Sequence, residues 1–134
     1  MNLSIYCDGA SKGNPGPASI GVFACETEHP EKEIFSISER IENTTNNTAE
    51  WTSLIEGIKK AREIGASKIQ IFMDSELVVK QVKGEYKIKQ PHLKALSVQA
   101  VSELKNITYT IQHIPREKNK KADALANLAF EKKK

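Results

Sequence analysis

The stretch SIYCDGASKGNPGPASIG, from Ser4 to Gly21, begins as a strand and then breaks its own pattern. Its first four residues suit a half-buried strand, and Asp8 ends that run. Glycines and prolines then crowd the segment that follows. Asp8 either makes a local turn with Gly9 and Ser11, or belongs to a site at the edge where a strand stops.

Hydrophobic periodicity along the rest of the chain predicts further strands and helices. We expect strands at 2–8, 18–25, 33–41, 68–73 and 107–114, and helices at 44–65, 75–84, 91–104 and 118–133. Leu125, Leu128 and Ala129 should share one side of the last helix. The first strands form an antiparallel meander, and the later ones, joined by helices, pair in parallel. The sequence therefore predicts an α/β fold with one mixed sheet, helices on both faces and a single domain over residues 1–134.

The bulk composition, with 39% hydrophobic and 28% charged residues, is that of an ordinary soluble protein. No stretch approaches the ~20 apolar residues of a membrane span, so we expect no membrane partner. No secretory signal is visible, and Cys7 and Cys25 are too few for a disulfide framework. We expect a reduced, cytoplasmic protein that is a monomer by default.

Charge is distributed unevenly along the chain. Residues 1–50 hold three Lys or Arg against eight Asp or Glu, whereas residues 51–115 hold ten against six and residues 116–134 hold seven against three. Basic later parts are compatible with a polyanionic partner. A scatter of solvating lysines explains the same counts.

Four acids stand beside the ends of predicted elements. Asp8 and Asp74 end strands, while Glu50 and Asp123 lie in first helical turns. If those two strands are parallel neighbours, Asp8 and Asp74 converge at the edge where open α/β sheets bind ligands. Local alternatives exist for each acid: an Asx turn at Asp8, a capping box of Asn47 and Glu50, an N-cap at Asp74, and a dipole-favoured first-turn acid at Asp123.

Several carboxylates in one cleft cannot all stay ionised without a counter-charge. Hard oxygen ligands favour Mg²⁺ or Mn²⁺. Two such ions would activate a water and stabilise the leaving oxygen of a phosphodiester. The sequence offers no zinc-type Cys/His spacing, no Walker phosphate loop and no clear Ser/His/Asp arrangement.

Four segments resemble, in order and spacing, the motifs of type 1 ribonuclease H. They are YCDGASKGNPGPASIG at 6–21, TNNTAEWTSL at 45–54, IFMDSELVV at 71–79 and HIPREKNKKADALANLAF at 113–130. The last is most similar to the short bacterial, archaeal and plant branch. The resemblance implies the ribonuclease H-like fold with strand order 3-2-1-4-5. It also implies a metal-dependent endonuclease that hydrolyses the RNA strand of RNA–DNA hybrids and leaves 5′-phosphate products.

The resemblance also assigns roles to residues. Asp8 would bridge two Mg²⁺ or Mn²⁺ ions, Glu50 and Asp74 would complete one shell, and Asp123 would join the other. Glu50 would lie near the RNA 2′-hydroxyl, the group that separates RNA from DNA. Expected substrate contacts are Gly9, Ser11, Asn14, Thr45, Asn46, Asn47 and Ser75. Turn and cap chemistry explains these polar residues equally.

Two departures from the family pattern matter. Residues 82–94 are short where many members carry a long basic insertion that grips hybrid. Lys83, Lys87, Lys89 and Lys94 with Tyr86 form either a reduced substitute or a solvated helix face.

The second departure concerns an auxiliary residue. The family often has a mobile-loop histidine that aids product release, and His113 has the matching spacing of ten residues before Asp123. It lies at the end of a predicted strand, however, where a structural or merely exposed histidine fits as well. Arg116 is the alternative helper.

Rival functions remain at this point. A nucleic-acid-binding protein that kept the fold but lost useful turnover is one, and the presence of all four acids disfavours it. Another nuclease of the same superfold, such as an integrase-like or Holliday-junction enzyme, is disfavoured by the TNN and NPG motifs.

Overall fold

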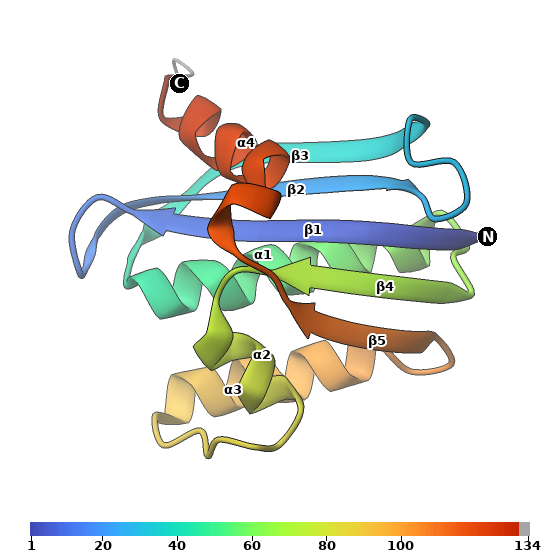
Figure 1. Cartoon of the computed structure of the whole chain (residues 1–134). Helices are drawn as coiled ribbons and strands as arrows, with labels where there is room; N and C mark the ends of the chain where they lie inside the picture. Colours follow the sequence, from blue (N-terminus) through green and yellow to red (C-terminus); the bar gives the residue numbers. More distant parts are fainter. Residues whose placement is uncertain (132–134) are drawn as a thin grey trace.

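A five-stranded mixed sheet with the order β3-β2-β1-β4-β5 organises the chain, as Figure 1 shows. The computed structural model describes residues 1–131, so the last two residues of the predicted final helix lie outside the described residues. The strands are β1 (Asn2–Ser11), β2 (Gly16–Glu26), β3 (Glu33–Thr44), β4 (Lys68–Met73) and β5 (Thr108–His113). β1 pairs antiparallel with β2 and parallel with β4. The predicted mixed sheet and its strand order are confirmed.

Helices cover both faces of the sheet, as predicted (Figure 1). The helices are α1 (Asn46–Glu63), α2 (Glu76–Val82), α3 (Pro91–Glu103) and α4 (Lys120–Glu131). α1 packs on β1 and β2 with α3 beside it, whereas α4 crosses the opposite face over β1, β2 and β3. A short 3-10 turn, Arg116–Lys118, precedes α4. Within residues 1–131, no helix is both long and apolar enough to cross a bilayer.

The side chains of the central strand β1 alternate between the two faces. Leu3, Ile5 and Cys7 are buried in the hydrophobic core that β1 shares with α1. Because successive side chains of a strand point to opposite faces, Tyr6 and Asp8 point to the other face, where α4 lies. The strand therefore carries core residues on one side and the first carboxylate on the other.

The prediction that the first strand ends at Asp8 is wrong. Only the parallel pairing with β4 stops there, with Cys7 opposite Met73 as its last pair. The antiparallel pairing with β2 continues from Asp8 to Ser11. Asp8 is thus a strand residue, which also excludes the Asx-turn alternative. It stands one residue beyond the last β4 pair, beside the position that Asp74 occupies after β4.

The buried side of α4 differs from the prediction. Ala122, Ala126 and Ala129 are buried, whereas Leu128 is 46% exposed. The reason is a close backbone contact at Gly21, where a Cβ would lie 2.1 Å from the carbonyl oxygen of Ala122. A helix that lies so near the sheet leaves room for alanine but not for leucine.

Replacement of Gly21 by alanine should therefore push α4 off the sheet. We expect the Gly21→Ala variant to lose about 2–3 kcal/mol of unfolding free energy in urea denaturation, because the new methyl group overlaps backbone atoms. Gly84→Ala is the matched control: Gly84 has φ +79 but open space around it, so only left-handed strain of about 1 kcal/mol applies. Equal losses in the two variants would contradict the close contact.

Candidate active site

Three carboxylates from separate elements meet at one end of the sheet. Asp8 of β1, Glu50 of α1 and Asp74 after β4 each place an oxygen within 4.8 Å of the others. Asp8 and Glu50 are buried, and Asp74 is half-buried. The parallel pairing of β1 with β4 brings Asp8 and Asp74 together, as the sequence predicted.

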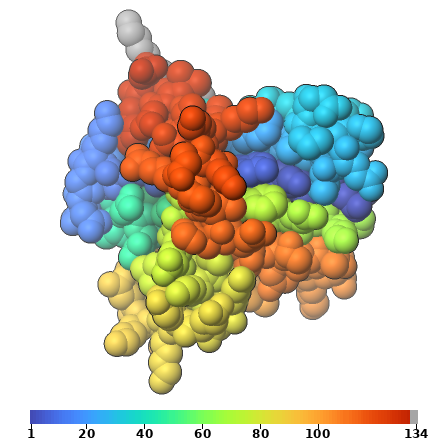
Figure 2. All heavy atoms as spheres, viewed as in Figure 1, coloured from blue at the N-terminus to red at the C-terminus, as the bar shows by residue number. Residues whose placement is uncertain are grey.

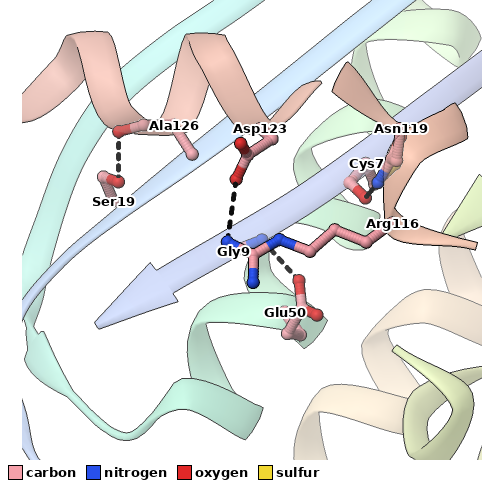
Figure 3. A network of polar contacts seen from close by, with 8 residues as sticks. All are labelled: Cys7, Gly9, Ser19, Glu50, Arg116, Asn119, Asp123 and Ala126. Atoms are coloured by element: carbon pink, nitrogen blue, oxygen red, sulfur yellow. Dashed lines mark hydrogen bonds and ion pairs between the residues drawn. The ribbon is translucent and has the colours of Figure 1, made fainter. Parts of the chain in front are cut away.

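Glu50 is held by a contact between α1 and β1. The backbone N–H of Gly9 donates a hydrogen bond to Glu50 Oε1 (Figure 3). A Cβ at Gly9 would lie 2.2 Å from the carbonyl carbon of Ala49, so only glycine lets the helix approach this closely. Gly9 was predicted as a substrate contact, and the structure shows that it also positions an acid.

The local alternatives for two of the acids are wrong. The N-cap of α1 is Thr45, whose hydroxyl accepts from Thr48 N at 3.3 Å, and Glu50 bonds across to β1 instead of closing a capping box. The N-cap of α2 is Ser75, whose hydroxyl accepts from Val78 N at 3.3 Å. Asp74 is therefore not a cap.

Asp123 approaches the cluster from α4, on the other side of β1. It lies in the first turn of that helix, and its carboxyl group is close enough to that of Asp8 to help raise the pKa of Asp8. The Arg116 guanidinium reaches back so that its Nη2 is 3.9 Å from Asp123 Oδ1 (Figure 3). The fourth predicted acid thus joins the site, with one cation beside it.

The crowded acids hold protons more tightly than free carboxyl groups do. Burial, followed by the charge of Asp74 and the contact with Asp123, raises the pKa of Asp8 to about 8. Burial and the charge of Asp8 raise the pKa of Glu50 well above its ordinary value, although the Gly9 N–H acts against this. A divalent cation would relieve the repulsion, and a cluster of carboxylate oxygens suits Mg²⁺ or Mn²⁺.

The acids line an open cleft of about 480 Å³. Its lining consists of Asp8, Gly9, Ala10, Ser11, Asn46, Glu50, Asp74, Ser75, Arg116, Asp123 and Asn127. All four predicted acids are present, together with several of the predicted substrate contacts and one of the two auxiliary candidates.

The other predicted residues lie outside this lining. Asn14 accepts a hydrogen bond on Oδ1 from Asn46 N at 3.0 Å, and so supports the neighbouring loop. Thr45 caps α1, and Asn47 lies in the first turn of that helix. His113 is exposed at the end of β5. Of the auxiliary candidates, the structure brings only Arg116 into the cleft.

Two residues of the site were missed by sequence reasoning. Asn119 is buried, and its Nδ2 donates to the carbonyl oxygen of Cys7 at 2.9 Å (Figure 3). Its own backbone carbonyl accepts from Asp123 N at 3.1 Å. Asn119 therefore ties the start of α4 to β1 one residue before Asp8. Asn119 could have been found from the sequence because it is an N-cap residue type just before a helix. Asn127 could have been found because it lies one helical turn after Asp123.

Comparison with known proteins identifies the family. A family model described as reverse transcriptase-like matches residues 6–129. The crystal structure of RNase H1 from the halophilic archaeon Halobacterium salinarum superposes with a TM-score of 0.93, at 36% identity over 98% of each chain. The chain belongs to the type 1 ribonuclease H family. The resemblance and the fold that it implied are thus confirmed.

Other members of the ribonuclease H family match over nearly the whole chain. The bifunctional protein Rv2228c of Mycobacterium tuberculosis is 40% identical over an alignment that covers 98% of this chain but 36% of that protein. The chain thus spans about a third of the length of the first curated relatives that it matches. LC11-RNase H1, solved in complex with an RNA/DNA hybrid, has a TM-score of 0.89 at 36% identity over 96% of each chain.

The raised pKa of Asp8 predicts a pH-dependent stability. Because the folded chain keeps a proton that the unfolded chain releases, the free energy of unfolding should fall as pH rises from about 4 to about 8. Asp8→Asn should flatten this fall and stabilise the metal-free protein by about 1–3 kcal/mol at pH 8. Urea denaturation in EDTA across this pH range measures both effects. An equally steep fall in Asp8→Asn would contradict the assignment.

Proposed function

We propose that this ribonuclease H family member is a metal-dependent endonuclease that hydrolyses the RNA strand of RNA–DNA hybrids within one domain, residues 1–134. The observation that carries the proposal is the close approach of Asp8, Glu50 and Asp74, whose oxygens lie within 4.8 Å of one another in an open cleft. The relative solved with an RNA/DNA hybrid supports the choice of substrate.

The acids would hold two Mg²⁺ or Mn²⁺ ions. Glu50 and Asp74 would bind one ion, Asp123 the other, and Asp8 both. The carboxylate chemistry fits these ions. Buried acids with raised pKa values, such as Asp8 and Glu50, are stabilised most in their ionised form by a neighbouring cation. When bound, such ions supply the positive charge that activates water and stabilises the leaving oxygen of a phosphodiester.

The chain's own contacts would keep these ligands in place. The Gly9 N–H fixes Glu50, and the Asn119 amide fixes the start of the helix that carries Asp123. Arg116 brings an exposed positive charge beside Asp123, where it can attract a phosphate of the substrate. Fixed ligands reduce the reorganisation needed during hydrolysis.

The other residues of the cleft would orient the substrate. Ser11, Asn46 and Ser75 present hydroxyl and amide groups to the same cleft as the acids. Such groups contact the sugar–phosphate backbone without reading sequence. Glu50 would face the 2′-hydroxyl of the RNA strand, which provides the discrimination against DNA.

Loss of a single ligand should remove cleavage. We expect Asp74→Asn to cut a labelled RNA–DNA hybrid at least about 100-fold more slowly in Mg²⁺ or Mn²⁺, because metal charge is worth several kcal/mol in the transition state. The control is Glu76→Gln, a nearby exposed acid of α2 that pairs with Lys80 at 3.2 Å; its rate should stay within about twofold.

Two outcomes would overturn this assignment. Undiminished cleavage by Asp74→Asn would contradict the assignment of the acid cluster as the active site. Tight binding of hybrid by the native chain, with no cleavage in either metal, would favour the binding-protein alternative.

The short basic segment between α2 and α3 gives a further prediction. Lys83, Lys87 and Lys89 are exposed there. The segment belongs to the yellow part that projects from the molecule in Figure 2. Neutralising all three with glutamine should weaken hybrid binding and reduce the slope of log affinity against log salt by about 0.9 for each phosphate that the variant no longer neutralises. Fluorescence anisotropy at several salt concentrations measures the slope.

The matched control neutralises three exposed lysines outside the cleft lining: Lys59 in α1, Lys68 at the start of β4 and Lys105 after α3. It removes the same charge and should leave the slope unchanged. An equal effect of both triple variants would assign the salt dependence to net charge rather than to the basic segment.

A further inference from the structure

A second hollow lies on the α4 side of the sheet. Its volume is about 230 Å³. Tyr6 and Phe23 of the sheet line it, together with Lys118 from the turn before α4 and Lys120 and Lys121 from the start of α4. The proposed nuclease chemistry uses none of these side chains.

One aromatic side chain of this hollow shares a face of the sheet with an acid of the cleft. Tyr6 stands two residues before Asp8 on β1, so both side chains point to the same face, and Tyr6 is paired with Phe72 of β4. The rings of Tyr6 and Phe72 stack with centroids 4.9 Å apart and an interplanar angle of 22°. Tyr6 therefore lies behind Asp8 on this face, and Phe72 supports its ring from outside the lining of the hollow.

One segment of chain, 116–123, forms a shared wall between cleft and hollow. Its Arg116 and Asp123 line the cleft, whereas its lysines line the hollow. In Figure 1 this segment crosses from β5 over β4 and β1 to α4. The bond from Asn119 to Cys7 fixes it to the sheet between the two sites. A strand of nucleic acid that leaves the cleft would reach the hollow across this segment.

The charge of the hollow selects an anion. Three lysines face one carboxylate, Glu117. Within residues 1–131, none of these lysines has a carboxylate oxygen within 4.0 Å, and Lys121 Nζ instead lies 4.3 Å from the centroid of the Phe23 ring. Proteins bind single-stranded nucleic acid with aromatic rings, on which bases stack, and with nearby cations that contact the phosphates. The hollow has both features, and its lysines have no acidic partner among the described residues.

We propose that this hollow binds one nucleotide of a single strand that extends from the hybrid. The base packs against the rings of Tyr6 and Phe23, and its phosphate lies near Lys118 and Lys120. The volume is below the roughly 300–1,000 Å³ of a site for a drug-sized ligand, which suits a single base. The inference rests on the proposed function, since it is the hybrid in the cleft that delivers the strand.

The test compares two hybrids of about 12 base pairs, one blunt and one whose DNA strand extends by about six thymidines at both ends. Fluorescence anisotropy in EDTA gives their affinities without cleavage. The native chain should bind the extended hybrid roughly tenfold more tightly, because each stacked base contributes that much. Tyr6→Leu should lose the advantage, and Tyr6→Phe should keep it.

A second variant makes the test independent of the packing of Tyr6. Lys118→Gln combined with Lys120→Gln changes only exposed side chains and should also remove the advantage. The charge-matched control, Lys59→Gln with Lys105→Gln, should keep it. Cleavage of the blunt hybrid in Mg²⁺ should stay within about twofold in all of these variants.

Equal affinities of the native chain for the two hybrids would overturn the proposal. An advantage that survives both Tyr6→Leu and the double lysine variant would overturn it as well. Binding is measured without metal and cleavage of the blunt hybrid separately, so failure of this inference and failure of the proposed function give different results. If the native chain prefers the extended hybrid but does not cleave, the result supports the proposed nucleotide site and contradicts only the proposed nuclease function.

Discussion

Backbone-to-backbone contact at two glycines decides where the acid-bearing helices lie. Gly9 lets α1 touch the central strand, and Gly21 lets α4 touch its neighbour, each at distances that a Cβ would forbid. Glu50 and Asp123 consequently approach Asp8 from opposite sides. Without these two contacts the helices would lie farther out, and carboxylates on short side chains would not meet.

The same closeness has an energetic consequence. Burial and mutual repulsion raise the pKa of Asp8 to about 8, which means that the folded chain keeps acids in a place where ionisation is unfavourable. Fold stability alone would favour neutral side chains at these positions. Retaining carboxylates there fits a site organised around a cation, and it follows the general tendency of active sites to sacrifice stability for chemistry.

The parts of the fold that depend on hydrophobic pattern and strand topology could be predicted from the sequence. Asp8 and Asp74 could be brought together because parallel strands end at the same edge of a sheet. Prediction failed where the outcome depends on contacts between distant elements. Asn47 and Thr45 offer similar capping chemistry. In the structure Thr45 caps α1, and Glu50 bonds to Gly9 of β1, a partner that no local pattern reveals. Likewise, nothing local shows that Leu128 faces outward, because the contact at Gly21 lies about 100 residues away.

The bond between Asn119 and Cys7 joins residues separated by 112 positions, and that between Ser19 and Ala126 joins residues separated by 107. Closing such long loops is slow and comes after local structure has formed. During synthesis, β1 to β4 and α1 therefore leave the ribosome well before α4 can dock on them. A nascent chain at that stage holds three of the four acids, and the complete set arises only when the fold itself is finished.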